Sequence, residues 1–269
     1  MAQTQMALDS QDFDATVALA ATVAPHVDIL EIGTPCIKHN GIELLKTLRE
    51  KFPNNKILVD LKTMDAGFYE AEPFYAAGAD ICTVLGTADI GTIKGFIDVA
   101  NKYNKMAQVD LINVADKKAR TLEVAKLGAH IIGVHTGLDQ QAAGQTPFTD
   151  LALVTSLNTG AKVSVAGGVK ANTAAQVVAA GADIVVAGAA IYGAEDPAAS
   201  AAEITGIVHA GNASSSCKKL LPWAILVGVV LLGFYAFNGD TVDVAATDAT
   251  ATTEQAVEVV SDVVEAATE

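Results

Sequence analysis

The chain has 269 residues, 51% of them hydrophobic, and its 17 Lys and Arg against 31 Asp and Glu give a formal net charge of -14. A chain of this length can form one large domain or two modest ones, and its apolar content is ample for a core. The acidic balance argues against nucleic acid as a partner.

Eight short apolar runs recur along the chain at a spacing of roughly 25 residues, as strands of a regular α/β fold would. They are residues 6–8, 27–32, 57–59, 81–85, 106–109, 131–134, 163–166 and 184–187. Amphipathic segments lie between them, for example residues 12–23, 42–51, 93–103 and 117–127. This alternation predicts a parallel sheet, and eight units predict a closed (β/α)8 TIM barrel. A doubly wound open sheet is the alternative, but no GxGxxG follows the first run.

Charged residues and glycines follow the apolar runs. They are Asp9, Glu31, Asp60, Lys62, Gly86, Asp110, His135, Gly167, Gly168 and Gly188. In a barrel, the ends of all these runs lie at one mouth, where such enzymes keep their chemistry.

The most informative segment is Asp60-Leu61-Lys62-Thr63-Met64-Asp65, which follows a buried strand. Side chains two apart on a strand point the same way, so Asp60 and Lys62 should project together, with Asp65 in the loop beyond. Buried charges are costly without partners, so this segment predicts a site. Lys62 is expected to keep the acids ionised or to stabilise developing negative charge. A Schiff base is disfavoured, because flanking acids raise a lysine pKa; a structural ion-pair network is the alternative.

Glu31 and Asp60 end neighbouring strands, so their carboxylates are expected to share a Mg²⁺ ion, which prefers oxygen ligands. A pair of salt-bridged acids at the barrel rim is the alternative. His135, at the end of the sixth run, is a candidate general base near neutral pH, although a lone histidine is often only a capped turn residue. Glycine-rich loops after the seventh and eighth runs, with Gly167, Gly168, Gly188 and Ala189, predict a phosphate site.

These residues occur in motifs that resemble a known family. The pattern Asp60-x-Lys62-x-x-Asp65 is similar to the signature of the orotidine 5'-monophosphate decarboxylase suprafamily, and within it the chain most resembles the 3-hexulose-6-phosphate synthases. The matching stretches are ALD (7–9), EIGTP (31–35), DLKTMDAG (60–67), TVLG (83–86), VDLI (109–112), HTGLD (135–139), SVAGGVK (164–170) and AIYGAEDPAA (190–199).

The resemblance implies a reversible aldol reaction of D-ribulose 5-phosphate with formaldehyde, giving D-arabino-hex-3-ulose 6-phosphate through an enediolate. It implies Mg²⁺ on Glu31 and Asp60, His135 as the base at C1, and charge stabilisation by Lys62. Asp9 and Asp110 are expected to bind the sugar, and Gly167, Gly168, Gly188 and Ala189 its phosphate. It further implies a homodimer in which catalytic Asp65 reaches the partner's site.

Two alternatives to this function remain. One is the sister 3-keto-L-gulonate-6-phosphate decarboxylase, which typically carries arginines where this chain has Leu138 and Ala189. The other is an inactive barrel that serves as a membrane scaffold; the intact set of candidate site residues argues against it.

The C-terminal region departs from the family pattern. Residues 220–239 carry no charge and match the length of a membrane-spanning helix; Lys218 and Lys219 precede them and eight acids follow in residues 240–269. We therefore predict a catalytic barrel over residues 1–210, a linker over 211–219, a transmembrane helix over 220–239 and a mostly disordered acidic tail. A buried or oligomer-forming apolar helix is the alternative to the span.

The cysteines and the N-terminus bear on the compartment. Cys36, Cys82 and Cys217 show no CxxC spacing, so neither a zinc site nor a disulfide framework is expected. The N-terminus has no basic segment followed by an apolar stretch, so no secretory signal peptide is predicted. The positive residues before the span then place the barrel in the cytoplasm, tethered to the membrane.

Overall fold

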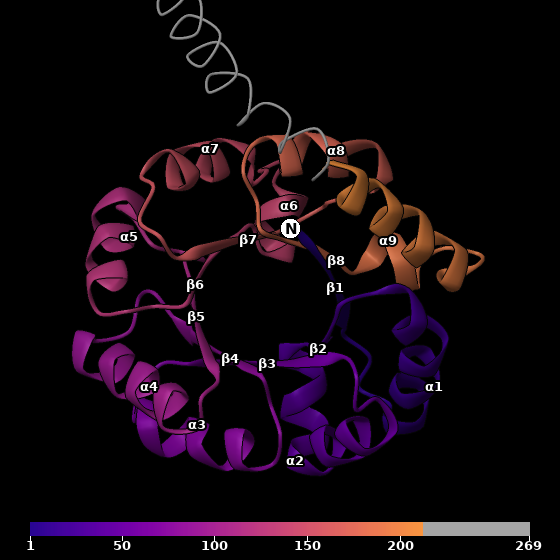
Figure 1. Ribbon diagram of the computed structural model, residues 1–269, viewed down its shortest axis with the longest axis horizontal. Coiled ribbons are helices and arrows are strands. Elements are labelled where there is room, and N and C mark those ends of the chain that lie inside the picture. Colours follow the sequence, from indigo (N-terminus) through magenta and orange to yellow (C-terminus); the bar gives the residue numbers. More distant parts are fainter. Residues whose placement is uncertain (212–269) are drawn as a thin grey trace, which may run out of the picture. The chain divides into compact units, whose positions relative to one another are not determined.

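The structure, a computed structural model, describes residues 1–211. Eight parallel strands pair in chain order, and the last closes onto the first, so the predicted (β/α)8 barrel is confirmed and the open sheet is wrong (Figure 1). The strands are β1 (Gln3–Leu8), β2 (Ile29–Ile32), β3 (Lys56–Thr63), β4 (Ile81–Leu85), β5 (Met106–Asp110), β6 (Ile131–His135), β7 (Lys162–Ala166) and β8 (Ile184–Ala187).

Helices surround the barrel and connect its strands (Figure 1). They are α1 (Phe13–Val23), the 3-10 turn η1 (Ala24–His26), α2 (Thr34–Lys51), α3 (Gly67–Ala76), α4 (Ile90–Lys102), α5 (Lys117–Lys126), α6 (Leu138–Ala142), α7 (Phe148–Ser156), α8 (Ala171–Ala179) and α9 (Ala189–Tyr192). Residues 197–211 are also helical.

The second helix differs from the predicted segment 42–51. It begins at Thr34, directly after β2, with Pro35 in its first turn, where proline needs no amide hydrogen. Gly41 has non-helical φ and ψ angles of 64° and -163° and separates two helical pieces. The amphipathic pattern therefore identified only the second piece.

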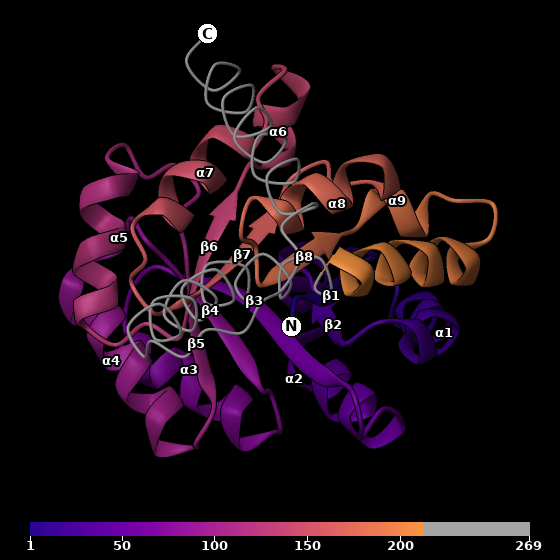
Figure 2. The same ribbon diagram turned by 45° about the horizontal axis from the view of Figure 1, so that its top comes forward.

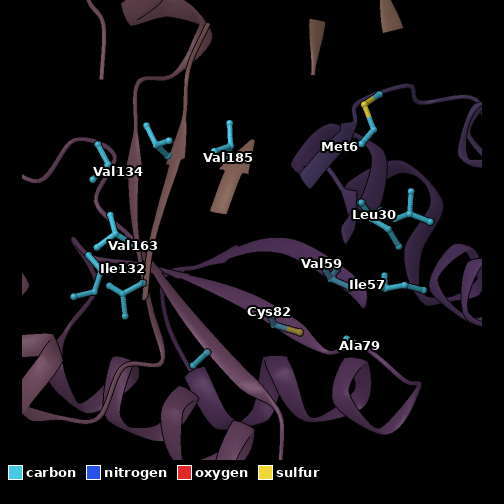
Figure 3. Close-up of a cluster of buried hydrophobic side chains, with 14 of the residues drawn as sticks. Met6, Leu30, Ile57, Val59, Ala79, Cys82, Ile132, Val134, Val163 and Val185 are labelled. Atoms are coloured by element: carbon cyan, nitrogen blue, oxygen red, sulfur yellow. The ribbon is translucent and has the colours of Figure 1, made fainter. Parts of the chain in front are cut away.

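The two faces of each strand pack against different partners, as the alternation of strand side chains requires. Outward residues such as Met6, Leu30, Val59 and Ile132 join the main apolar core with the helices (Figure 3). Inward residues Ile29, Leu58, Ile81, Ile131, Ile184 and Val186 form a second apolar cluster inside the barrel. Each fully buried side chain of this kind stabilises the fold by about 1.5–3 kcal/mol. The inner cluster closes the barrel below its C-terminal mouth.

The candidate site lies at the C-terminal mouth, the end of the barrel at which the strands end and the loops to the helices begin. Because all eight strands are parallel, the residues that follow them come together there. Figure 2 shows that α6, which follows β6, lies beyond this end of the strands.

The predicted membrane span and tail, residues 220–239 and 240–269, lie outside the described residues, as does all of the predicted linker except residue 211. Within residues 1–211, no helix combines the length and the apolar character needed to cross a bilayer.

Candidate functional site

A cavity of about 810 Å³ opens at the C-terminal mouth of the barrel. Of the residues that the sequence places at this mouth, Asp65 and Gly86 do not line it, and the others do: Asp9, Glu31, Asp60, Lys62, Asp110, His135, Gly167, Gly168, Gly188 and Ala189. Residues from seven strands or the loops after them therefore reach one space, as the barrel topology predicts.

The Asp60 carboxylate is held by three side-chain donors. It is 7% exposed and accepts hydrogen bonds from Thr34 Oγ1 at 2.7 Å, from Thr83 Oγ1 at 2.6 Å and from Lys62 Nζ at 2.7 Å. These donors come from α2, β4 and the same strand, so the Asp60 carboxylate is fixed in one orientation.

Lys62 lies at an irregularity of β3. The register with β4 shifts between Val59 and Thr63, and Lys62 has a φ of 46°, a left-handed conformation that costs a lysine roughly 1 kcal/mol or more. Its backbone N–H donates to Thr83 Oγ1 at 3.0 Å. The bulge therefore aims the ammonium group, which could not be deduced from strand periodicity alone.

The Lys62 ammonium bridges two acids. Its Nζ lies 2.7 Å from Asp60 Oδ2 and 3.0 Å from Asp110 Oδ2. Burial by itself would lower the Lys62 pKa, but the charges of Asp110 and Asp60 outweigh burial and raise it. Lys62 is therefore a permanent cation, which agrees with the expectation that it forms no Schiff base.

Asp110 joins this lysine to the histidine. Its Oδ2 lies 2.8 Å from His135 Nδ1, and its Oδ1 accepts from the Ile112 N–H at 2.9 Å. Burial would raise the Asp110 pKa, but the hydrogen bond and charge of His135 and the charge of Lys62 lower it to about 2. For His135, burial lowers the pKa, and the bond to Asp110 reverses this and raises it above 6.5.

Two further carboxyl groups, those of Glu31 and Asp9, make this end of the cavity acidic. Glu31 is 8% exposed, and its Oε2 accepts from Gln5 Nε2 at 2.6 Å. Burial, followed by the charge of Asp60, raises the Glu31 pKa to about 8. Burial and Asp60 also raise the pKa of Asp9. The Asp9 carboxylate packs against Gly33. A Cβ atom at Gly33 would lie 2.0 Å from Asp9 Oδ1, so only glycine fits at this position.

The acidic cluster has the composition of a Mg²⁺ site. Within residues 1–211, no group of three or more His, Cys, Asp or Glu side chains is arranged so that it could hold a metal ion. Mg²⁺ nevertheless often uses only one or two carboxylates, with water and substrate oxygens as its other ligands. Burial, and after it the negative charge of Asp60, raises the pKa of both Glu31 and Asp9, and the opposing charge of Lys62 does not reverse this in either acid. The residues present therefore fit a divalent cation.

Glycines shape the opposite side of the cavity. Gly167 and Gly168 follow β7 with φ angles of 122° and 70°, which L side chains rarely adopt. A Cβ atom at Gly167 would also lie 2.7 Å from the Thr136 carbonyl oxygen. Gly188 and Ala189 follow β8 and line the same cavity. The phosphate role of these four residues stays a prediction.

Asp65 is the candidate that does not join the others. Its carboxylate accepts from the Ala66 N–H at 2.7 Å, in the exposed loop after β3. It lines a separate, shallow hollow with α3 and α4. The second partner of Lys62 is therefore Asp110 from β5 and not Asp65, because the chain turns away at the left-handed Ala66.

Five further polar residues were not predicted from the sequence: Gln5, Thr34, Gln108 and Ser164, which line the cavity, and Thr83, whose hydroxyl donates to Asp60. Four of them interrupt otherwise apolar strands at inward positions. A polar residue at an inward strand position near the C-terminal end is the signal that could have found those four.

Comparisons with known proteins agree with the barrel fold. Residues 2–204 match the family model described as Orotidine 5'-phosphate decarboxylase / HUMPS family. The chain is 83% identical over 207 residues to a 3-hexulose-6-phosphate synthase of Methylomonas aminofaciens, covering 77% of this chain and 99% of that protein.

Two solved structures share the fold. The 3-hexulose-6-phosphate synthase from Salmonella typhimurium is 37% identical with a TM-score of 0.76, covering 78% of this chain and 99% of that one. The 3-keto-L-gulonate-6-phosphate decarboxylase from Vibrio cholerae is 28% identical with a TM-score of 0.69, covering 77% and 97%. The similarity to the synthases is therefore the stronger.

The buried acid Glu31 gives a test of the cation site. A carboxyl group whose pKa is raised by folding stabilises the fold below its unfolded pKa, near 4.5, and that contribution is lost as the pH rises through the folded value, about 8. We expect the protein in chelator to lose stability over this range, by at most about 1.4 kcal/mol per pH unit for one proton. Urea unfolding at a series of pH values measures it.

The Glu31→Gln variant should remove this slope, whereas Glu203→Gln, which changes an exposed acid, should retain it. Added Mg²⁺ should restore the stability of the original chain at pH 8 and leave Glu31→Gln little changed. Equal slopes in the original chain and Glu31→Gln would contradict the assignment.

Proposed function

The chain belongs to the Orotidine 5'-phosphate decarboxylase / HUMPS family, and from this premise we propose that it catalyses the reversible aldol reaction of D-ribulose 5-phosphate with formaldehyde. The product is D-arabino-hex-3-ulose 6-phosphate, and the enzyme class is an aldehyde-lyase. The 83% identity to a 3-hexulose-6-phosphate synthase supports this choice. The observation that carries the chemistry is the hydrogen-bonded series of Asp60, Lys62, Asp110 and His135 in the cavity.

His135 is the base that removes a proton from C1 of the sugar phosphate. Its Nδ1 faces the Asp110 carboxylate at 2.8 Å, which keeps a proton on Nδ1 and leaves Nε2 as the basic atom of the neutral ring. Asp110 also stabilises the ring after it has gained a proton. The low pKa of Asp110 means that this acid stays ionised while His135 cycles.

Lys62 stabilises the negative charge that develops when the C1 proton leaves. Because its raised pKa keeps it charged, it acts by electrostatics and not as a nucleophile. Glu31 and Asp60 would hold Mg²⁺, which would supply Lewis-acid polarisation of the sugar carbonyl. Asp9 accepts hydrogen bonds from sugar hydroxyls. The glycine loops after β7 and β8 bind the phosphate through main-chain N–H groups.

Two side chains favour the aldol reaction over the decarboxylase alternative. Leu138, at the start of α6, is 72% exposed, and Ala189 begins α9; both line the cavity without a positive charge. The sister decarboxylases typically carry arginines at these two positions, so the uncharged residues here favour the synthase. Assays of both substrates side by side separate the two functions.

The first test measures two rates: exchange of the C1 proton and consumption of formaldehyde. With ribulose 5-phosphate and Mg²⁺ in deuterated water, we expect exchange at C1 and, with formaldehyde added, its consumption. His135→Gln should slow both by at least about 100-fold, the contribution of a positioned base. His39→Gln, an exposed histidine outside the cavity, should leave both rates unchanged. A fully active His135→Gln protein would remove the base from this mechanism.

The pH profile tests the Asp110–His135 pair. Because the His135 pKa is raised, kcat/KM should fall as the pH drops through a value above 6.5. Asp110→Asn removes the charge that raises this pKa and leaves the burial that lowers it. Its acid limb should therefore move to lower pH, with a reduced maximum. An unmoved limb would mean that another group controls the profile.

We also propose that the enzyme is a homodimer in which Asp65 completes the partner's site. Asp65 lies outside the cavity of its own chain, beside exposed Met64, Phe68 and Tyr69, which are 53%, 38% and 81% exposed. A contiguous exposed apolar group of this kind is typical of an interaction surface.

Mixing two inactive variants tests the shared site. Asp65→Asn and His135→Gln should each be nearly inactive, because each lacks one member of every site. Random mixed dimers restore one intact site in half of the dimers, so unfolding and refolding the two together should recover about a quarter of the original activity. Recovery of none would place Asp65 outside the partner's site.

Residues 220–239 are proposed to anchor the barrel on the cytoplasmic side of a membrane, since they are uncharged and follow two lysines. Ending the chain at residue 211 should move the protein from the membrane pellet to the supernatant with turnover unchanged. Continued sedimentation of the shortened protein with membranes would contradict the anchor.

A further inference from the structure

Two buried glutamines form part of the cavity floor. Gln5 on β1 is 1% exposed and Gln108 on β5 is 7% exposed, and both line the cavity. In each, the side-chain oxygen Oε1 is buried without a hydrogen-bond partner among residues 1–211. Leaving a buried polar atom without a hydrogen bond costs about 1–3 kcal/mol of stability, so such atoms usually bind a water or a ligand.

The amide groups of the two glutamines differ in their surroundings. Gln5 Nε2 donates to Glu31 at 2.6 Å and is thereby committed to the acidic cluster. Gln108 lies against Gly133 on β6, where a Cβ atom would come within 3.1 Å of its Nε2 and 3.4 Å of Ser164 Oγ. Because Gly133 has no side chain, a buried amide and a buried hydroxyl lie together at this point of the floor.

This part of the floor lies directly below the proposed reacting groups. Gln108 and Gly133 precede Asp110 and His135 by two residues on their strands, so each pair points to the same side. Asp110 and Gly133 are also Cα partners in the β5–β6 register. In the proposed mechanism C1 of the sugar lies beside His135, and the second reactant must approach C1.

We infer that the Gln108 amide and the Ser164 hydroxyl form the binding subsite for the one-carbon aldehyde, an assignment that rests on the proposed function. The aldehyde has one oxygen, which accepts hydrogen bonds from Gln108 Nε2 and Ser164 Oγ. Met106 precedes Gln108 by two residues on β5, and Ile131 precedes Gly133 by two residues on β6. Both point inward and close the space below the subsite. The subsite therefore takes a very small aldehyde.

The same groups suit the change that the aldehyde undergoes. C1 of the enediolate forms a bond to the aldehyde carbon, and the electron pair of the C=O double bond moves to the oxygen. That oxygen takes the proton that His135 removed from C1, so no oxidant, reductant or further reactant is needed. The product hydroxyl is a donor as well as an acceptor, and the unpaired Gln108 Oε1 accepts its hydrogen.

The experiment separates the two halves of the reaction. In Gln108→Met and Ser164→Ala, we expect the KM for formaldehyde to rise about tenfold, the effect of one lost hydrogen bond. Deuterium exchange at C1 without formaldehyde should stay within about twofold of the original rate, because the sugar and His135 are unaffected.

Gln5→Met is the matched comparison, since it makes the same substitution on another strand of the floor. It removes the donor to Glu31, so we expect slower C1 exchange and weaker Mg²⁺ dependence with little change in the KM for formaldehyde. Should Gln108→Met fail to fold, Ser164→Ala and Gly133→Ala carry the expectation, since a methyl group at Gly133 displaces the Gln108 amide.

An unchanged KM for formaldehyde in folded variants of Gln108 and Ser164 would overturn the subsite. A slower C1 exchange together with a higher KM for formaldehyde would also overturn it, because that result would indicate a general structural role for these residues. Failure of the proposed function is a different result: the original chain would then neither exchange the C1 proton nor consume formaldehyde.

Discussion

The site depends on the contacts of the Asp110 carboxylate with Lys62 and His135. This carboxylate accepts from Lys62 on one side and from His135 on the other, and it is 2% exposed. A carboxylate buried without those cations would take up a proton, since burial disfavours its charge. Its ionisation in turn raises the pKa of both Lys62 and His135, so the protonation of each member of this trio depends on the others.

The barrel makes this concentration of charge tolerable. An apolar layer that includes Ile29, Leu58 and Ile131 fills the interior below the site, while the polar residues occupy the inward positions near the mouth. Hydroxyl and amide donors from adjacent strands hold the acids, as Thr83 does for Asp60 and Gln5 for Glu31. Parallel pairing brings these donors together from positions more than 20 residues apart in the chain.

The two sides of the cavity carry different chemical groups, and each part of the proposed substrates is assigned to the side whose groups suit it. Acids, lysines and His135 occupy the side formed by β1 to β6, where proton transfer and metal binding would take place. Left-handed glycines and exposed main chain occupy the side after β7 and β8. The polar floor at Gln108 and Ser164 lies between inward apolar residues and the Asp110–His135 pair. The places proposed for the phosphate, the sugar and the aldehyde therefore lie in different parts of one cavity.

The sequence by itself determined the barrel, because eight apolar runs at regular spacing leave few other ways to bury them, and it placed Glu31, Asp60 and His135 at one mouth. Only the tertiary structure decided which charges meet. Lys62 pairs with Asp110 and not with Asp65, because a bulge and a left-handed Ala66 redirect the chain after β3. Likewise, Gln5 and Gln108 read as ordinary strand residues until closure of the barrel aims their amides into the cavity. Strand periodicity gives the side on which a residue lies, whereas contacts between strands depend on register and local backbone geometry.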